Sequence, residues 1–369
     1  MISTNHLFYM LLFLEMVNLS LYVLIGLNKY SNLGIEIAYK YFIQSSYVTI
    51  IGLFGVSIIY IRAGTLFMSE LNFFMPLYIN DYILFFSFFL VFITFFFKLG
   101  LFPLHNWVAD LYQNGHLSTV VFLAVVPKIA YIYVIFELYK IVHDSRFIFY
   151  FLILIGALSV IYGSILSLYE ASIRRLLGFG SIVHMGFIIL GISTFELLGV
   201  ASAFFYVSSY VLLALNFFLI LLLFIDKKED SDEIIFVDYI AMFSMFLNKN
   251  VLLSIIFSFI ILSLAGLPFF VGFFSKLYVL LSLIASGYFF LVIILLFLNI
   301  LATLYYIRLI RFLLFIENKN MKIVQRPTGV KYSRILYYTI IFLFILNILM
   351  LFFHNYVLLF ILSNIIVFF

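Results

Sequence analysis

Long apolar runs separated by short polar segments cover almost the whole chain. A helix needs about 20 apolar residues to cross a lipid bilayer. The runs that meet this length predict an all-α, polytopic membrane protein of about 10–11 transmembrane helices. The predicted spans are residues 7–27, 46–63, 82–102, 118–138, 147–168, 179–195, 198–225, 251–283, 287–312 and 335–353, and the apolar tail 355–369 fits a half-span or an interfacial segment.

Glycine and proline interrupt two of these runs. The run 251–283 is too long for one straight span, and LAGLPFFVGFF stands at its middle. The run 82–102 meets KLGLFP at its end. Non-helical backbone at membrane depth occurs only where it is buried in protein or lines a cavity. We therefore predict two broken helices, with breaks near Leu99–Pro103 and Ala265–Gly272.

The two interrupted runs are the third and the eighth of the predicted spans. Corresponding interrupted segments are typical of inverted repeats built around a site at the membrane midplane. A repeat of five helices crosses the membrane an odd number of times, so the next repeat begins on the opposite side and has the inverted orientation. This spacing predicts a first repeat in residues 1–140, a second inverted repeat in 141–315, and a basic loop with a C-terminal helix in 316–369.

Lysine and arginine are distributed unequally between the two sides of the predicted spans. Cytoplasm-facing loops carry an excess of these residues, so the richer side is the inner one. Only Arg62, Lys140 and Arg146 fall on the poorer side, which also holds the N-terminus. The richer side holds Lys29, Lys40, Arg174, Arg175, Lys227, Lys228, Lys249, Arg308, Arg311, Lys319, Lys322, Arg326, Lys331 and Arg334.

The remaining three lysines lie alone inside apolar runs, each close to a proline. A charge at the bilayer centre costs about 2.5–3.5 kcal/mol, so Lys98, Lys128 and Lys276 mark a candidate path for protons or ions. A buried lysine readily gains and loses a proton. Two plainer interpretations stay open: Lys98 could extend its ammonium group to the membrane interface, and Lys276 could belong to a loop.

One acid and one histidine join these lysines as candidates for proton transfer. Glu15 is mid-span, where it would be either neutral and hydrogen-bonded or paired with a cation, and Lys98 is the partner we expect. His184 is also mid-span, where it would act either as a proton relay or as a hydrogen-bonded packing residue. His105 and His116 stand near a break and a span start, where contact with solvent is equally plausible.

Composition excludes several other classes of protein. Of the 369 residues 67% are hydrophobic and 10% are charged, which leaves little room for a soluble domain. Cysteine is absent, so disulfides and thiolate metal sites are impossible. We find no phosphate-binding loop and no histidine pair at metal-ligand spacing, so we predict no cofactor or metal in this chain. The 50 Phe and 27 Tyr, against only five Pro, favour an A/T-rich genome such as that of an organelle.

Four motifs in order resemble one family over nearly the whole chain. LEMVNLSLYVL, FKLGLFPLHNWVADLYQ with FLAVVPKIA, ASIRRLLGFGSIVHMGFIILGIS and LSLAGLPFFVGFFSKLYVL are similar to signatures of the antiporter-like membrane subunits of respiratory NADH:ubiquinone oxidoreductase, complex I. The match is best to the subunit 2 branch, the counterpart of the bacterial N subunit. Lys276 stands where some other branches have glutamate.

The resemblance implies a proton-translocating subunit of a mitochondrial inner-membrane NADH:ubiquinone reductase, with its N-terminus facing the intermembrane space. Glu15 would modulate Lys98, Lys128 would be the central lysine, and His184 would join a polar axis that ends at Lys276. NADH, flavin, iron–sulfur clusters and ubiquinone would bind to other subunits. The partners would be other membrane-arm subunits, including antiporter-like neighbours, and lipid.

The chain departs from the family pattern in two ways. It begins at the family's fifth helix, so four preceding helices are expected to be lost or supplied by another polypeptide packed on residues 7–27. His116 stands where the family often has proline. Two other functions remain possible: a subunit of a multisubunit cation/proton antiporter, and a structural assembly subunit whose lysines are vestigial. Glu15 is the only carboxylate in the predicted membrane core, which argues against a sodium site.

Overall fold

The computed structural model describes most of the chain. It covers residues 3–26, 32–75, 81–223, 225–227, 234–236, 251–314 and 334–366. Among these residues, nine helices are long and apolar enough to cross a membrane. They are α1 (Leu7–Gly26), α2 (Asn32–Ala63), α4 (Tyr82–Leu99), α6 (Leu117–Val142), α7 (Arg146–Tyr169), α8 (Ile173–Ser193), α9 (Leu197–Leu222), α13 (Phe289–Leu314) and α14 (Arg334–Phe352).

Shorter elements complete the described fold. The helices are α3 (Met68–Phe74), α5 (Asn106–Asn114), α11 (Val251–Ala265), α12 (Val271–Ala285) and α15 (His354–Ile366). The strands β1 (Ile225–Lys227) and β2 (Ile234–Phe236) pair antiparallel beyond the end of α9. Apart from this small hairpin, the described residues are all-α, as the apolar runs predict.

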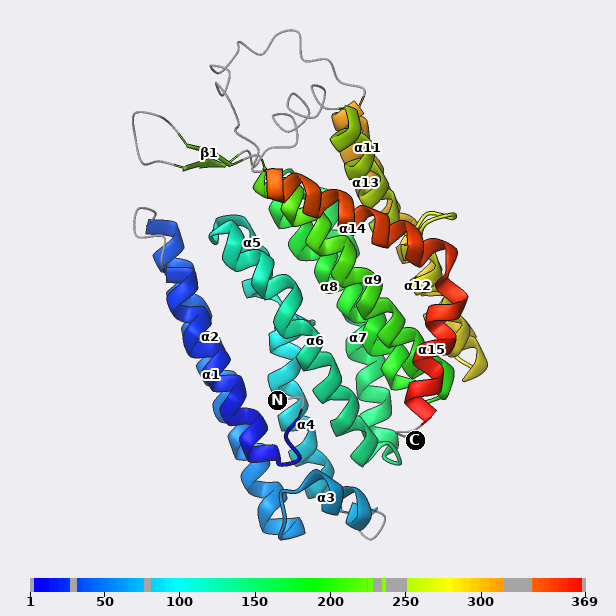
Figure 1. Cartoon of the computed structure of the whole chain (residues 1–369). Coiled ribbons are helices and arrows are strands. Elements are labelled where there is room, and N and C mark those ends of the chain that lie inside the picture. The colour runs from blue at the N-terminus through cyan, green and yellow to red at the C-terminus, as the bar shows by residue number, and fades with distance from the viewer. Residues whose placement is uncertain are drawn as a thin grey trace.

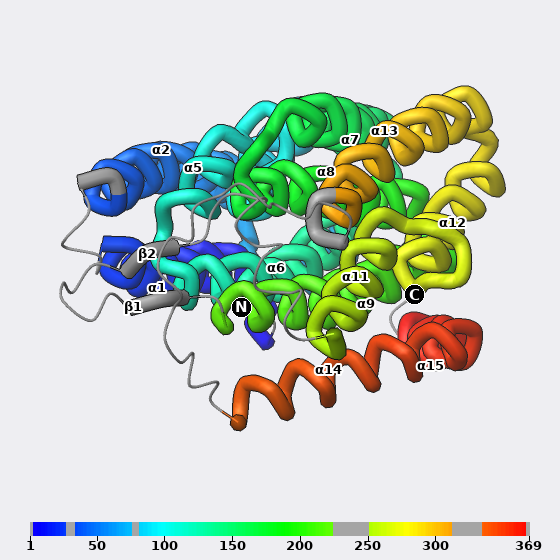
Figure 2. The backbone as a smooth tube through the Cα atoms, turned by 90° about the horizontal axis from the view of Figure 1, so that it is seen from above, coloured from blue at the N-terminus to red at the C-terminus, as the bar shows by residue number. Residues whose placement is uncertain are grey.

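The long helices run side by side and form one bundle (Figures 1 and 2). Helices α1 and α2 flank one side of it, and α11, α12 and α13 flank the other. The buried helix α8 packs against α5, α7, α9 and α12, which places it at the centre of the bundle. Helix α14 lies obliquely across α9, and the apolar tail forms α15, which also packs on α9.

Both predicted breaks are confirmed. Helix α4 ends at Leu99, and Gly100 follows with a positive φ of 75°. Helix α11 ends at Ala265, and Gly266 follows with a φ of 78°. Only glycine adopts this left-handed backbone without strain, so it ends each helix next to the lone lysine. Gly100 and Gly266 are buried in protein, as such segments require in lipid, whereas Pro103, Pro268 and Phe269 are exposed.

The structure corrects two predicted boundaries and adds two helices. Helix α8 begins at Ile173, six residues before the predicted start at 179. Helix α2 begins at Asn32, well before residue 46, because its first turns are polar rather than apolar. Glu36 and Lys40 pair there on the exposed face, 2.5 Å apart, and support the helix. Helices α3 and α5 are too short to appear as membrane spans.

Basic residues at one end of the bundle agree with the predicted sidedness. Arg308 donates from Nη1 to the carbonyl oxygen of Leu168 at 2.7 Å. Arg175 pairs with Glu170 at 3.2 Å, at the same end. Arg62 pairs with Asp81 at the opposite end, where α2 ends and α4 begins, at 3.8 Å. The predicted inner residues Lys29, Lys228, Lys249, Lys319, Lys322, Arg326 and Lys331 lie outside the described residues.

Candidate functional site

Lys98 occupies the last turn of α4, directly before the break. Its side chain is only 2% exposed. Its Nζ donates to the hydroxyl of Tyr41 on α2 at 3.3 Å and lies 5.0 Å from the centre of the Tyr41 ring. The ammonium group therefore stays inside the protein and does not extend to an interface. A tyrosine ring and hydroxyl stabilise a cation at such a site without neutralising it.

Glu15 does not form the direct ion pair with Lys98 that we expected. The two groups are close enough for a charge–charge interaction. Within the described residues, however, they form no ion pair within 4.0 Å. The reason is that α2 packs against both α1 and α4 and brings Tyr41 to Lys98. Glu15 itself is half-buried.

The polar face of α1 continues from Glu15 toward α2. Asn18, one turn further along α1, is fully buried, and neither of its amide atoms has a partner in the described part of the chain. Tyr22 then hydrogen-bonds to Ser45 on α2, and its ring lies 5.8 Å from that of Tyr41. Polar groups thus lead from Glu15 across α2 to Lys98.

Lys128 lies in the middle of α6 and is also 2% exposed. Its Nζ donates to the hydroxyl of Tyr112 on α5 at 3.3 Å, and the ring of Tyr210 on α9 lies 5.6 Å away. The hydroxyl of Tyr112 also interacts with Ser181 and with Tyr210. The helix that follows the first break thus supplies the partner of the central lysine.

His184 sits on the central helix α8 between two tyrosines. Its Nδ1 is 2.9 Å from the hydroxyl of Tyr206, and its Nε2 is 3.4 Å from the hydroxyl of Tyr306. Both Lys128 and Lys276 are close enough for their charges to act on the imidazole. A neutral imidazole donates from one nitrogen and accepts at the other, so this histidine can pass a proton between the tyrosines.

Lys276 lies on α12, the second half of the second broken helix, and is 3% exposed. It is not a loop residue. Its Nζ donates to the carbonyl oxygen of Ala265 at 2.9 Å and to Oδ1 of Asn299 on α13 at 2.6 Å. The last carbonyls of a helix lack intrahelical partners and carry partial negative charge. The break at Gly266 therefore creates the cation site that holds Lys276.

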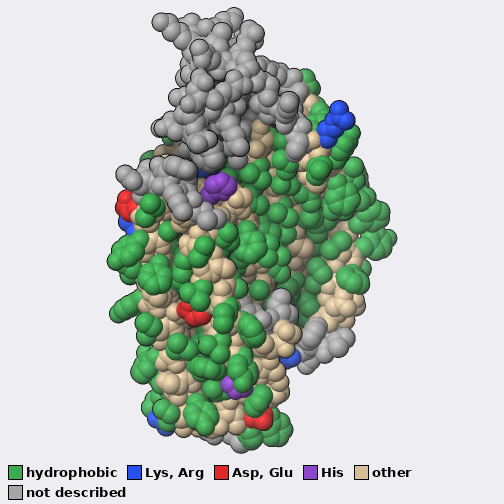
Figure 3. Space-filling model, turned by 60° about the vertical axis from the view of Figure 1, so that its left-hand side comes forward, with side chains coloured by type: hydrophobic (Ala, Val, Ile, Leu, Met, Phe, Trp, Pro, Cys, Tyr) green, Lys and Arg blue, Asp and Glu red, His purple; other side chains and the backbone are tan. Residues whose placement is uncertain are grey.

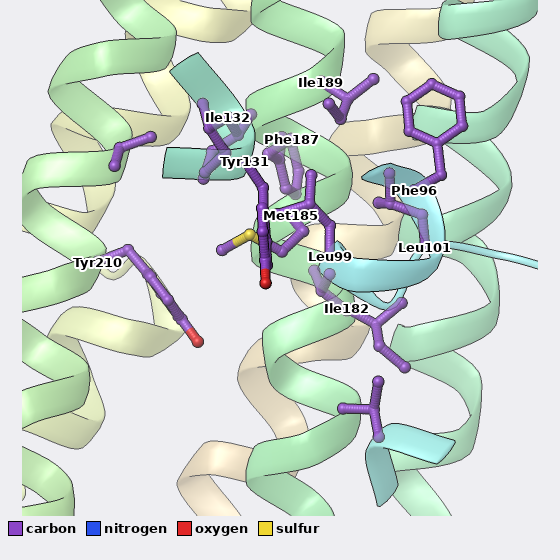
Figure 4. Packing of buried hydrophobic residues seen from close by; sticks show 14 of the residues in the cluster. Phe96, Leu99, Leu101, Tyr131, Ile132, Ile182, Met185, Phe187, Ile189 and Tyr210 are labelled. Carbon is purple, nitrogen blue, oxygen red and sulfur yellow. The ribbon is translucent and has the colours of Figure 1, made fainter. Parts of the chain in front are cut away.

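A small cavity lies beside His184, and the two tyrosines that contact Lys128, Tyr112 and Tyr210, also line it. Its volume is about 10 Å³, and about 10–15 Å³ is needed for one water molecule. Apolar packing surrounds this region: among the side chains labelled in Figure 4, only Tyr131 and Tyr210 carry oxygen atoms. The cavity is lined by Tyr112, Leu177, Ser181, His184, Tyr210, Ala214, Phe217, Phe218, Leu264 and Tyr306.

The other two histidines do not join this set. His105 is buried before α5, stacks on Phe102, meets Tyr162 edge-to-face, and has an Nδ1 without a partner in the described residues. His116 precedes α6, is half-buried, and its Nδ1 lies 2.7 Å from the hydroxyl of the exposed Ser118.

Sequence reasoning missed the groups that connect the candidate residues. Tyr41, Tyr112 and Tyr306 contact Lys98, Lys128 and His184, respectively. In a chain with 27 tyrosines, these three carry no distinguishing signal. Asn299 had one weak signal, since it is a polar residue inside an apolar run.

Comparisons with known proteins identify the family. Residues 4–302 match the family described as NADH:quinone oxidoreductase/Mrp antiporter, TM. NADH-quinone oxidoreductase subunit N of Azoarcus sp. (strain BH72) is 28% identical over 347 residues, 90% of this chain and 68% of that protein. The subunit N of Ruthia magnifica subsp. Calyptogena magnifica is 32% identical over 324 residues, 86% of this chain and 66% of that protein. The chain thus spans about two thirds of the length of these curated relatives.

Solved structures share the fold. A chain of respiratory complex I from Thermus thermophilus superposes with a TM-score of 0.79 at 24% identity, covering 97% of this chain and 75% of that one. A chain of the Mrp complex from Dietzia sp. DQ12-45-1b gives 0.82 at 20% identity, covering 98% and 73%. Because the family match covers most of the sequence, this chain belongs to the NADH:quinone oxidoreductase/Mrp antiporter transmembrane family.

Proposed function

We propose that this chain is a proton-translocating membrane-arm subunit of NADH:quinone oxidoreductase, equivalent to subunit N. One observation carries the proposal: three lysines are buried in the bundle, and neutral oxygen atoms hold each of them. The partners are the hydroxyl of Tyr41, the hydroxyl of Tyr112, and the oxygens of Ala265 and Asn299. A buried lysine without a carboxylate partner is poised to release its proton, because burial disfavours the charged form.

In this proposal the five candidate residues act in sequence. Glu15 senses an electrostatic change in a neighbouring subunit and modulates Lys98 by charge. Lys98 then alters the protonation of Lys128, and His184 connects Lys128 to Lys276. Against a membrane potential of about 150–200 mV, moving one proton requires roughly 3.5–4.6 kcal/mol. A change of one charge near a buried lysine can supply this amount, since charges interact strongly at low dielectric.

The location and the partners follow from the same proposal. The amino-acid composition indicates an A/T-rich genome and so favours a mitochondrial chain of the subunit 2 type. Such a chain lies in the inner membrane, with its N-terminus toward the intermembrane space. The redox groups (NADH, flavin, iron–sulfur clusters and ubiquinone) belong to other subunits of the complex. The repeats 1–140 and 141–315 then each contribute one broken helix and its lysine.

A cation/proton antiporter is the competing function, because the family includes Mrp antiporters. Sodium prefers carboxylate or carbonyl oxygens. In the four contacts above, the oxygen atoms that could bind a sodium ion already accept hydrogen bonds from lysine ammonium groups. A proton is therefore the better cargo.

We expect proton translocation by the purified complex in lipid vesicles to be independent of sodium. Replacing sodium with choline should leave the initial rate, followed with a pH-sensitive dye, unchanged. An uncoupler, which collapses the pH gradient, serves as the control for the signal. Loss of the signal in choline, together with a sodium flux opposite to the proton flux, would establish the antiporter function instead.

We also propose that a helix of another polypeptide packs on α1. The outer face of α1 is apolar, and Figure 3 shows the hydrophobic character of this side of the molecule. Glu15 lies half-buried beside that face, and a carboxylate partly exposed to hydrocarbon is costly. The exposed side chains that would contact the partner are Phe8, Phe13, Met16, Leu19 and Val23.

A photo-crosslinking residue in place of Phe13 should give a protein adduct in the assembled complex. The same residue at Phe290 of α13, which is 78% exposed against 46% for Phe13, is the control for non-specific capture. Mass spectrometry of the adduct identifies the partner. Lipid adducts alone at position 13 would contradict this proposal and leave the α1 face to the bilayer.

A further inference from the structure

Two adjacent tyrosines on α13 extend the polar groups beyond His184. Tyr305 and Tyr306 are almost fully buried, and their ring centres are 4.3 Å apart. The hydroxyl of Tyr306 faces Nε2 of His184 at 3.4 Å. The hydroxyl of Tyr305 interacts with that of Tyr306 and with Ser167 on α7. Four polar side chains from three helices are therefore in contact.

A glycine leaves the space that the two hydroxyls occupy. Gly180 lies on α8, one turn before His184. A Cβ atom at this position would lie 2.9 Å from the hydroxyl of Tyr306 and 3.7 Å from that of Tyr305. Any other residue would displace the Tyr306 hydroxyl, because a contact below 3.0 Å is too short for a real Cβ atom.

The series of contacts ends at the buried Ser167, close in sequence to the basic end of the bundle. Ser167 is two residues before the end of α7, and Glu170 follows the last residue of that helix. Arg308, one turn after Tyr305 on α13, donates to the carbonyl oxygens of Leu168 and Glu170. The Glu170 carboxylate pairs with the partly exposed Arg175, so this end of the series reaches polar surface.

We propose that Tyr306, Tyr305 and Ser167 form a proton branch that joins His184 to the basic end of the bundle at Glu170, and that Gly180 keeps this branch open. The inference rests on the proposed function, since it supplies protons to the same residues. It adds a connection to the aqueous side at which Arg308 and Arg175 lie.

The chemistry of the branch requires no ionised tyrosine. Each hydroxyl both donates and accepts, so it can take a proton on its oxygen while it passes its own proton onward. A proton taken up at Ser167 thus appears at Nε2 of His184, which becomes an imidazolium when its Nδ1 is already protonated. Ser167, Tyr305 and Tyr306 each end with the number of protons they had before, and only their hydrogen bonds reverse direction.

Replacing Tyr306 with phenylalanine removes one hydroxyl and little volume. We expect the proton translocation rate per assembled complex to fall about tenfold, below the roughly 10²–10⁴-fold of an obligatory proton-transfer group, because loss of the hydroxyl enlarges the cavity that Tyr306 lines and makes room for a water molecule in its place. The solvent deuterium isotope effect on this rate should rise. Tyr139→Phe is the matched control: Tyr139 is also buried, but its hydroxyl bonds to the backbone of Ser193 near the other end.

Gly180→Ala tests the same branch without removing a hydroxyl. It should reduce the rate and raise the isotope effect as Tyr306→Phe does, whereas Gly26→Ala, whose new Cβ would meet only Ala38 at 3.9 Å, should not. Normal rates and isotope effects in both Tyr306→Phe and Gly180→Ala would overturn the branch. If Lys128→Met also pumps normally, the proposed function fails as well; if Lys128→Met does not pump, only the branch is wrong.

Discussion

Replacing Lys128 with methionine should abolish proton translocation while leaving the complex assembled. Lys128 is buried at the middle of α6, and Tyr112 and Tyr210 connect it to the rest of the bundle. Methionine has a similar length and adapts to apolar surroundings, and removing a buried charge is often neutral or stabilising. The expected loss is roughly 10²–10⁴-fold, the contribution of an essential proton-transfer group.

The measurement is the initial rate of vesicle acidification per assembled complex, with subunit content checked on native gels. Lys140→Met is the matched control, because Lys140 lies on the same helix, near its end, and is not fully buried. Normal pumping by Lys128→Met would show that the lysine is structural. Loss of assembly in Lys128→Met, with the remaining complex pumping normally, would favour the assembly-subunit interpretation.

Replacing Gly272 with alanine should prevent stable folding of the second broken helix. Gly272 lies in the first turn of α12, where this helix crosses α11. A Cβ atom there would lie 1.8 Å from the backbone oxygen of Ser263, and backbone cannot move aside as a flexible side chain does. Overpacking in a well-packed core costs about 1–3 kcal/mol, and a clash with backbone should exceed that range.

We expect the assembled complex to contain far less of this subunit. The complex that does assemble should have a lower thermal transition temperature. Any complex that does form should pump poorly, since a shift of α12 moves Lys276 away from Ala265 and Asn299. Gly26→Ala, which meets no close atom, should change stability by less than about 0.5 kcal/mol. Wild-type levels and stability of Gly272→Ala would contradict the close crossing of α11 and α12.

The local sequence predicts the breaks because glycine and proline act on their own backbone. Gly100 and Gly266 adopt a left-handed conformation that other residues reach only at a cost, so each helix ends where the sequence places them. The length of each apolar run likewise depends only on the bilayer thickness, so the long spans are correct to within a few residues at most ends. Helices α2 and α8 are the exceptions, since polar or charged residues in their first turns weaken the hydrophobic signal.

The partners of the candidate residues depend on distant parts of the chain. Tyr41 precedes Lys98 by 57 residues, and Tyr306 follows His184 by 122. No local rule connects such pairs, and tyrosine is too common in this chain to stand out. The expected pairing of Glu15 with Lys98 is wrong for the same reason: the position of α2 between α1 and α4 follows from helix packing.

The sequence by itself determined that the protein is a polytopic helical bundle, that two of its helices are broken, and that three lysines lie inside it. These properties follow from the transfer of each segment from water to lipid and from the backbone preferences of single residues. Only the tertiary structure decided which groups hold those lysines, and that tyrosines connect them to His184 and to the basic end. Such contacts depend on the packing of helices far apart in sequence, because side chains meet only where crossing helices bring their buried faces together.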